Sequence, residues 1–398
     1  MIDLAAEGTK IGSMPSHSCV FAQIMSALHQ QEFARCVERF PPPRRPHGLS
    51  AYDHFLALCF AQLTGREGLR DLVVCLNARL ARTYQAGFRT RLTRTNIAYA
   101  NKHRDWRTLS SVAQVLMRRA ARLYATHPAD PELPQLSYAL DSSLIDLSLA
   151  LFPWAEWHHT AAAVKLHILL ALRGAVPAWT AVTDGCFPDT LALEHVPLEK
   201  GAFYVMDRGY LDFRGLARLH YAGAFFVVRS KCPINFRLVT SRPVDKTSGL
   251  RCDQTVRLGR GRSWQSFPFE LRRVRVRDEV NGSSLVLLTN HFELPTTVVA
   301  ELYRCRWQVE LFFKWIKGHL RLRAFLGRSE NAVRLQVWSA ICAYLLVAIA
   351  KKEFGLPQSL HQILQVISVS PFELVPLPDL FVTPPIESQP TSQLLLLP

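Results

Sequence analysis

The sequence predicts a mixed α/β protein with a helical N-terminal part and a β-rich insertion. Up to residue 130, apolar residues recur at three- and four-residue spacing, as in amphipathic helices. From residue 134, short apolar or alternating runs bounded by Gly, Pro and Asp follow one another and then alternate with helical stretches, which is typical of a mixed sheet. Between residues 232 and 292, strand-like runs become rich in arginine, which indicates a separate insertion.

The composition indicates an anionic partner. The 398 residues are 49% hydrophobic, enough for a sizeable core, and 47 Lys and Arg against 32 Asp and Glu give a formal charge of +15. Such a charge points to nucleic acid or an anionic membrane. The longest apolar run, 340–350, is too short to span a bilayer and predicts a buried helix, and residues 1–13 lack a signal-peptide hydrophobic stretch. Nucleic acid is therefore the favoured partner, no membrane association is expected, and the predicted location is cytoplasmic.

Several other kinds of site are disfavoured. The nine cysteines are widely spaced without a Cys-x-x-Cys pair, which argues against a disulfide framework and a structural zinc site. Neither a G-x-x-x-x-G-K-[ST] loop nor a convincing G-x-G-x-x-G after a strand occurs, which argues against ATP and NAD chemistry.

The helical part is predicted most clearly at residues 50–65 and 106–125, with a Pro-rich segment at 40–48 between two helical stretches. Residues 79–107 carry eight Lys or Arg and one acid, with aromatic residues interleaved. This segment is either a solvated basic face or a surface for the DNA backbone, and the charge of the whole chain favours the second.

The α/β part follows in a definite order. Five strands are predicted at residues 135–149, 161–172, 176–185, 201–209 and 223–231. Two helices are predicted between them, at residues 189–198 and 211–223.

The basic insertion is predicted to contain strands at residues 271–279 and 283–290 and a basic turn at 259–264. Its residues 251–277 hold eight Arg and two acids. Long amphipathic helices resume at Leu294, and a loosely packed, Pro-rich tail follows Ser370. The expected regions are therefore 1–130 (helical, DNA-binding), 131–231 (core, first part), 232–292 (basic insertion), 293–370 (C-terminal helices of the core) and 371–398 (tail).

Two aspartates lie where strands carry functional groups. Asp141 lies in the first predicted strand, with apolar residues before it and small polar residues after it. Asp207 directly follows the fourth strand, so it should point out of the carboxyl edge of the sheet, where α/β proteins form active sites. Either residue alone is more often an ordinary cap or strand end.

A third carboxylate lies in a predicted helix at residues 303–319. At about 3.6 residues per turn, Tyr303, Arg306, Glu310 and Lys317 fall within an arc of roughly 60°, and Lys314 lies close to the same stripe. A surface salt-bridge ladder is an equally good explanation of this helix on its own. Together with the two aspartates, however, the glutamate completes a set of hard oxygen ligands for two Mg²⁺ ions of the kind that cleave phosphodiesters.

At this point the sequence resembles a known family. The spacing Y-x₂-R-x₃-E-x₆-K, met by Tyr303, Arg306, Glu310 and Lys317, resembles the signature of the IS4-type insertion-sequence transposases, a branch of the DDE transposases. ALDSSLIDL, KLH, VTDGCFPD and DRGY resemble the family's strand and loop motifs in the same order, although Pro188 stands where members often have His. The similarity extends over residues of roughly 17–355.

The resemblance implies an RNase H-like catalytic core interrupted by a β-rich insertion and preceded by an all-helical N-terminal domain. It implies that Asp141, Asp207 and Glu310 are catalytic residues and ligands of Mg²⁺ or Mn²⁺, with two ions. It also implies that Tyr303, Arg306 and Lys317 contact DNA, and that Trp264 of the insertion either contacts a flipped base or is a half-buried structural residue. Lys314, which lies close to the same stripe, is expected to bind DNA phosphates as well.

The implied partners are the inverted-repeat ends of the element, target DNA, and a second copy of the chain in a synaptic dimer near the bacterial nucleoid. The implied reaction is hydrolysis of one strand, followed by attack of the exposed 3′-hydroxyl on target DNA. Two alternatives remain: a nuclease without strand transfer, and a decayed copy that only binds DNA. Three further carboxylates, Asp146, Asp184 and Asp189, rank below the chosen three.

Overall fold

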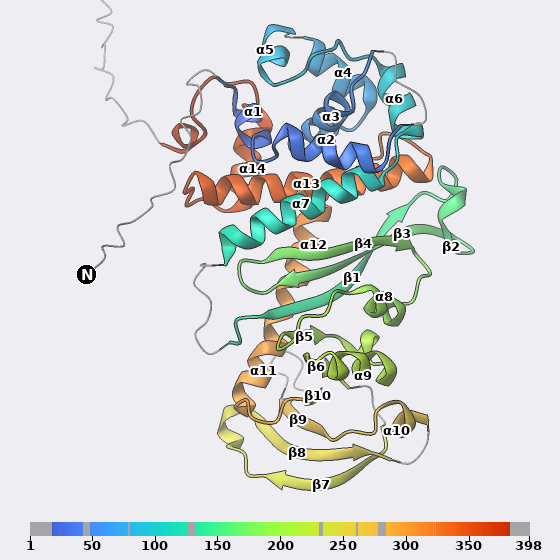
Figure 1. The fold of residues 1–398 in the computed structure, drawn as a ribbon, viewed down its shortest axis with the longest axis vertical. Coiled ribbons are helices and arrows are strands. Elements are labelled where there is room, and N and C mark those ends of the chain that lie inside the picture. Colours follow the sequence, from blue (N-terminus) through green and yellow to red (C-terminus); the bar gives the residue numbers. More distant parts are fainter. Residues whose placement is uncertain are drawn as a thin grey trace, which may run out of the picture.

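The structure, a computed structural model, describes residues 18–382 except 43–47, 79, 126–132, 231–233, 260–261, 278–283, 321 and 323. Parts of the predicted Pro-rich segment, basic turn and C-terminal tail, together with Arg79, therefore lie outside the described residues. Figure 1 shows a helical region, a long mixed sheet and a β-rich end, arranged along one axis. The coarse prediction of an α/β protein with a helical N-terminal part is confirmed.

The N-terminal region contains helices only, among its described residues. They are α1 (Val20–Met25), α2 (Gln30–Arg39), α3 (Ala51–Leu63), α4 (Leu69–Asn77), α5 (Leu80–Gln85), α6 (Arg94–His103) and α7 (Arg107–Tyr124). The predictions for residues 50–65 and 106–125 are confirmed by α3 and α7. Ser50 starts α3 because its side chain accepts a hydrogen bond from the backbone N–H of Asp53.

The long helix α13 (Glu330–Glu353) forms the centre of this region and packs against α3 and α7. The apolar run at 340–350 is buried within it, as predicted. The helix is longer than that run and, by length and composition alone, would be able to cross a membrane. However, 94% of its most apolar stretch is buried inside the protein, so it is a core helix.

The described strands form one ten-stranded sheet in the order β2-β3-β1-β5-β6-β10-β9-β8-β7, with β4 also paired to β3. They are β1 (Ser137–Leu147), β2 (Glu156–His158), β3 (Ala161–Ala171), β4 (Val176–Asp184), β5 (Phe203–Met206), β6 (Phe225–Arg229), β7 (Phe236–Arg242), β8 (Leu250–Leu258), β9 (Leu271–Arg277) and β10 (Ser284–Thr289). β3 runs antiparallel to β1 and β4, whereas β5 runs parallel to β1 and β6. All five predicted core strands are confirmed.

The insertion continues the same sheet, because β10 pairs antiparallel with β6. The predicted strands correspond to β9 and β10, but β7 and β8 were not predicted. The predicted basic turn is wrong in part: residues 262–266 form a short helix, α10 (Arg262–Ser266).

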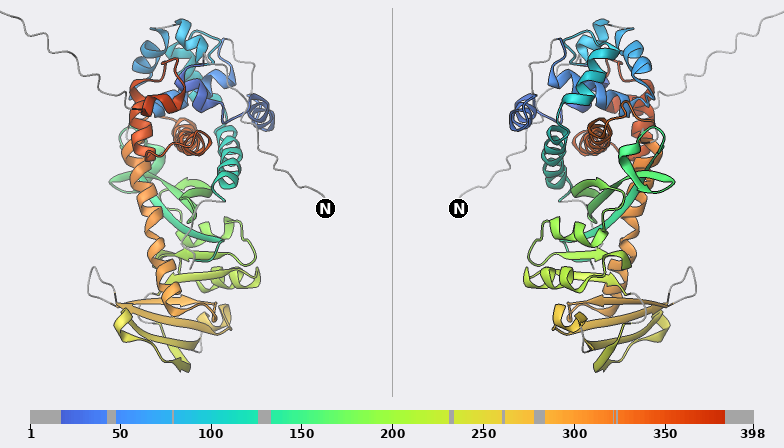
Figure 2. Two further views of the ribbon diagram at one scale, coloured as in Figure 1. Left: turned by 90° about the vertical axis from the view of Figure 1, so that its left-hand side faces the viewer. Right: turned by 90° about the vertical axis from the view of Figure 1, so that its right-hand side faces the viewer.

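Helices cover both faces of the core sheet. On one face α8 (Asp189–His195) and α9 (Phe213–Tyr221) pack on Leu140, Leu169 and Tyr204. On the other face, side chains such as Ala139 and Ile168 join the cluster of α12 (Trp307–His319) and α13. Figure 2 shows α11 (Thr296–Cys305) and α12 running along one side of the sheet from the insertion to the helical region.

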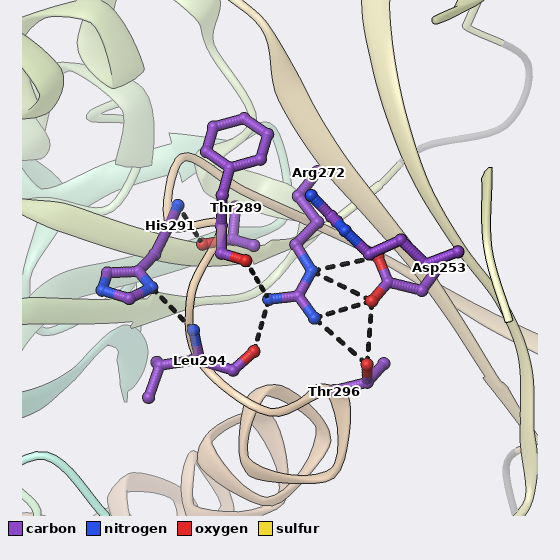
Figure 3. Close-up of polar contacts among 8 residues, drawn as sticks. Asp253, Arg272, Thr289, His291, Leu294 and Thr296 are labelled. Carbon is purple, nitrogen blue, oxygen red and sulfur yellow. Dashed lines mark hydrogen bonds and ion pairs between the residues drawn. The ribbon is translucent and has the colours of Figure 1, made fainter. Parts of the chain in front are cut away.

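A buried ion pair fastens the insertion to the start of α11 (Figure 3). Arg272 of β9 donates to both carboxylate oxygens of Asp253 on β8, with the shortest distance 2.7 Å, and both side chains are 3% exposed or less. The same guanidinium donates to the carbonyl oxygens of Phe292 and Leu294 and to Thr296 Oγ1. Arg272 therefore holds the insertion together. It is not the exposed base that its place in the basic run 251–277 had suggested.

The segment after Ser370 packs against the core as far as Phe381, through Leu377 and several partly buried apolar side chains, which corrects the prediction of a loose tail for that part. The backbone N–H groups of Val20 and Phe21 donate to carbonyl oxygens of Glu373 and Pro371, and Leu377 is fully buried. The segment follows α14 (Leu360–Val369) and covers the start of the helical region.

Candidate active site

The sheet topology places Asp141 and Asp207 side by side. β1 and β5 are parallel neighbours, and their last paired residues are Leu140 and Met206. The two aspartates are the next residue on each strand, so both lie at the carboxyl edge of the same parallel pair. This follows from the buried apolar runs that precede each of them, which fix the two strands in the core.

Glu310 reaches the same place from α12, and Arg306 links it to Asp141. One guanidinium nitrogen of Arg306, Nη1, lies 3.1 Å from Asp141 Oδ2, and the other, Nη2, lies 2.5 Å from Glu310 Oε1. The hydroxyl of Tyr303 donates to Asp207 Oδ1 at 3.2 Å. Arg306 therefore bridges two of the predicted carboxylates and Tyr303 contacts the third, with the Arg306 guanidinium 5.7 Å from the centre of the Tyr303 ring.

The predicted single helix over 303–319 is wrong at Arg306, which lies between α11 and α12. The N–H of Arg306 donates to the carbonyl oxygen of Tyr303, and the N–H of Val309 donates to that of Arg306, so the chain makes tighter i→i+3 turns here. Tyr303 therefore belongs to a different helix from Glu310. The four signature residues do not share one ideal stripe, although Tyr303, Arg306 and Glu310 still lie close together.

The acidic cluster is largely withdrawn from water. The side chains of Arg306, Asp141 and Glu310 are 14%, 20% and 34% exposed. Burial raises the pKa of Asp141 to about 6; the carboxylates of Glu310 and Asp207 add to this effect, while the Ser142 backbone N–H and Arg306 oppose it. Burial is also the main cause of the raised pKa of Tyr303.

The donor set suits a hard divalent cation, because Mg²⁺ and Mn²⁺ prefer carboxylate oxygens. In their present positions, however, no three His, Cys, Asp or Glu side chains among the described residues are close enough together to hold a metal ion. The contacts of Arg306 give a physical reason, since its guanidinium takes oxygens of Asp141 and Glu310 that a metal would need. The residues fit a metal by their chemistry, provided that Arg306 leaves.

Of the remaining predicted DNA-binding residues, Lys314 and Lys317 lie further along α12 and Trp264 lies in the insertion. Lys314 is exposed on α12, and Lys317 is partly buried one turn further along. Trp264 is 45% exposed on α10, which packs against α9 and β8. None of the contacts described here joins Trp264 to the three carboxylates. Arg306, expected to contact DNA, is instead paired with carboxylates.

A second polar cluster, which the sequence did not reveal, lies behind Asp141. Asp189 Oδ1 accepts a hydrogen bond from Ser142 Oγ at 2.7 Å and lies 3.3 Å from Lys165 Nζ. Buried His167 lies opposite Ser142 in the register of β1 and β3. Because neighbouring residues of a strand point to opposite faces, this cluster backs the sheet on the side away from Asp141.

Two sequence motifs contain residues of this cluster: KLH contains Lys165 and His167, and VTDGCFPD contains Asp189. Nothing in either motif shows that these residues lie close together. The other lower-ranked carboxylates lie elsewhere. Asp146 is exposed on β1, and exposed Asp184 lies 3.5 Å from Arg334.

The buried position of Asp141 predicts that Asp141→Asn stabilises the metal-free protein. Because the folded-state pKa is about 6 against an ordinary 3.8, the folded chain keeps a proton between these values that the unfolded chain has lost. The contribution of this group to stability is thus greatest below pH 3.8 and is lost as the pH rises through about 6. The uncharged side chain of Asp141→Asn avoids this loss of stability at higher pH.

Urea unfolding in EDTA tests this prediction. Asp141→Asn should unfold at a higher urea midpoint than the wild type at roughly pH 8, and its advantage should shrink at about pH 5. An advantage that grows as the pH falls would contradict the stated cause.

Known proteins resemble the chain over this region. A family model described as a transposase DDE domain matches residues 134–346, and a model of a domain of unknown function, DUF4372, matches residues 16–89. Because the first match covers more than half of the chain, the chain belongs to the transposase DDE domain family.

Individual relatives carry transposase names, and two of them are named for insertion sequences, as the resemblance predicted. "Putative transposase y4zB" of Sinorhizobium fredii is 35% identical over 217 residues, covering 54% of this chain and 60% of that protein. "Probable transposase for insertion sequence element IS5377" of Geobacillus stearothermophilus is 30% identical over 216 residues, covering 54% of this chain and 56% of that protein. "Putative transposase for insertion sequence element IS4SA" of Synechocystis is 26% identical over 232 residues, covering 55% of this chain and 62% of that protein.

The chain thus matches less than two thirds of the length of these curated relatives. Among solved structures, a cryo-EM structure of the piggyBac transposase synaptic complex with hairpin DNA aligns with 92% of this chain and 82% of its own chain, at 10% identity and a TM-score of 0.41.

Proposed function

We propose that the chain is the DNA transposase of an IS4-type insertion sequence, which binds the inverted-repeat ends of its element and performs metal-dependent strand cleavage and strand transfer. The observation that supports this proposal is that Arg306 bridges Asp141 and Glu310 while the nearby Tyr303 contacts Asp207, so that the three carboxylates surround one pair of side chains. Three carboxylates suit metal-dependent cleavage of phosphodiesters. The arginine and tyrosine beside them are side chains that commonly contact DNA phosphates.

An RNase H-like core is the finer fold that we propose. Its support is the order β4-β3-β1-β5-β6, in which β3 is antiparallel to β4 and β1, and β1, β5 and β6 are parallel, with acidic residues on β1 and directly after β5. The proposed regions remain 1–130, 131–231, 232–292, 293–370 and 371–398, the third interrupting the core.

Asp141, Asp207 and Glu310 would hold Mg²⁺ or Mn²⁺, with two ions in the active form. Such ions activate a water or a 3′-hydroxyl and stabilise the leaving oxygen. The chain's own cations would position the DNA: Arg306 and Lys317 would bind phosphates beside the scissile bond, with Lys314 further along the strand. Tyr303 would keep Asp207 in place through its hydrogen bond.

The charge of +15 supports DNA, both element ends and target, as the partner. Not every base in the two basic segments is available for it. Arg272 is buried against Asp253, and Arg104 donates to backbone carbonyls of Leu49 and Ser50. Among the described residues of the second segment, the exposed arginines are Arg251, Arg257, Arg275 and Arg277, of which Arg257 pairs with Glu270. A dimer in the synaptic complex is part of the same proposal.

A strand-joining assay separates this function from its two alternatives. The purified chain, Mg²⁺, a target plasmid and a duplex with the element's terminal sequence, already cut at its 3′-hydroxyl, should yield covalently joined product. Nicking of uncut ends without any joining would favour a nuclease without strand transfer. Specific binding with neither reaction would favour a decayed copy.

A further inference from the structure

We propose that Arg306 is an internal counter-cation of the acidic cluster, which leaves when a divalent metal enters and then binds a DNA phosphate. Metal loading and DNA binding would thereby be coupled through one side chain. This inference rests on the proposed function only in taking Asp141, Asp207 and Glu310 as the metal site.

The contacts of Arg306 place it where a metal would act. Its two terminal nitrogens reach Asp141 Oδ2 and Glu310 Oε1, which come from different elements of the fold, β1 and α12. A cation that bridges two carboxylates in this way uses the same oxygens that a bridging metal ion needs. The guanidinium and the metal therefore exclude each other.

The site also leaves Arg306 incompletely satisfied. Its Nε is buried and has no hydrogen-bond partner among the described residues, although an arginine side chain has five N–H donors. The guanidinium lies 5.7 Å from the centre of the Tyr303 ring, whose hydroxyl donates to Asp207. An unpaired buried donor costs free energy, so this arrangement is less favourable than a fully hydrogen-bonded structural ion pair.

Without a cation, the carboxylates would repel one another in a partly buried site. Arg306 supplies one positive charge, whereas each metal ion supplies two, so a metal is the stronger counter-ion once it is available. The displaced guanidinium remains beside the site and requires an anion. A DNA phosphate suits it, because the planar fork of arginine pairs with phosphate oxygens through two hydrogen bonds.

Coupling of this kind is reciprocal: DNA that withdraws Arg306 must tighten metal binding, and metal that displaces Arg306 must tighten DNA binding. A fixed structural role for Arg306 predicts no such relation. Its removal would only lower stability and loosen the metal site.

The test measures Mn²⁺ binding to the DNA-free protein by electron paramagnetic resonance, at about pH 8, so that carboxyl groups of ordinary pKa are ionised. Arg306→Gln should bind Mn²⁺ roughly tenfold more tightly than the wild type, in the usual range of coupling between two ligands. Arg304→Gln is the matched control. It removes the same charge from the neighbouring exposed residue, which pairs with Glu301 at 2.9 Å, and should leave Mn²⁺ affinity unchanged.

Glu310→Gln distinguishes the failure of this inference from that of the proposed function. If Glu310→Gln weakens Mn²⁺ binding but Arg306→Gln binds no tighter than the wild type, the counter-cation role is overturned and the metal site stands. If Glu310→Gln binds Mn²⁺ as the wild type does, the metal site itself is wrong.

Two further measurements of Mn²⁺ affinity use a variant that keeps the charge and a DNA duplex. Arg306→Lys, which keeps the charge but loses the two-pronged contact, should bind Mn²⁺ with intermediate affinity even if Arg306→Gln folds poorly. A duplex with the element's terminal sequence should raise the Mn²⁺ affinity of the wild type and not that of Arg306→Gln. An equal rise in both proteins would contradict the coupling.

Discussion

Asp141→Asn, Asp207→Asn and Glu310→Gln should each abolish metal-dependent strand cleavage while leaving DNA binding largely intact. Each change removes one charged oxygen ligand and keeps the size of the side chain. The cleavage rate should fall by more than about a hundredfold, because mutation of residues that only orient metal ligands already costs about 10–100-fold in metal affinity or activity. Affinity for element ends should survive, because most of it comes from phosphate contacts elsewhere.

Single-turnover cleavage and gel-shift binding on the same protein samples measure the two effects. Asp146→Asn is a matched control: it lies on the same strand as Asp141 but is exposed, and it should cleave at the wild-type rate. Substantial Mg²⁺-dependent nicking by Asp207→Asn would count against the assignment of these residues.

Breaking the Asp253–Arg272 pair should cause the largest loss of stability. Both side chains are almost fully buried, so Arg272→Met leaves a carboxylate with one remaining cationic partner, Arg242, and Asp253→Asn leaves a buried guanidinium short of its charge partner. Removing one member of such a pair costs about 3–5 kcal/mol in free energy of unfolding. The N-terminus of α11 should loosen as well, because Arg272 also holds the carbonyl oxygens of Phe292 and Leu294.

Urea denaturation of each variant measures this loss. Glu270→Gln, which breaks the exposed Arg257–Glu270 pair, should cost less than about 1 kcal/mol. A double variant, Asp253→Leu with Arg272→Met, should recover much of the stability, since it leaves no unpaired buried charge. A loss below about 1 kcal/mol in Arg272→Met would show that the pair contributes little.

The sequence predicted the core strands well, because each is a short apolar run between turn residues. It also predicted that Asp141 lies in the first strand and that Asp207 directly follows the fourth predicted strand, and the parallel pairing of β1 and β5 brings the two residues to neighbouring positions. By contrast, β7 is mostly exposed along its length, and β8 buries the polar residues Asp253 and Thr255. Neither strand shows the hydrophobic pattern on which the prediction of strands depends.

Two of the features that the sequence did not predict depend on long-range partners, and a third is a local turn. In the sequence, Arg272 is one of several arginines in a basic run. Only the structure shows that Asp253 and the start of α11 surround it. The turn at Arg306 interrupts an apparently continuous helical pattern. Asp189 meets Lys165 only because α8 folds back onto β3.

The central claim is that Asp141, Asp207 and Glu310 together hold the catalytic metal ions. Anomalous X-ray scattering from Mn²⁺ in crystals of the chain bound to element-end DNA tests it most directly. Manganese should lie between these three carboxylates, with the Arg306 guanidinium turned from Asp141 and Glu310 to a phosphate. Manganese bound elsewhere in a complex that cleaves its DNA in the crystal, with the three carboxylates free of metal, would contradict the claim.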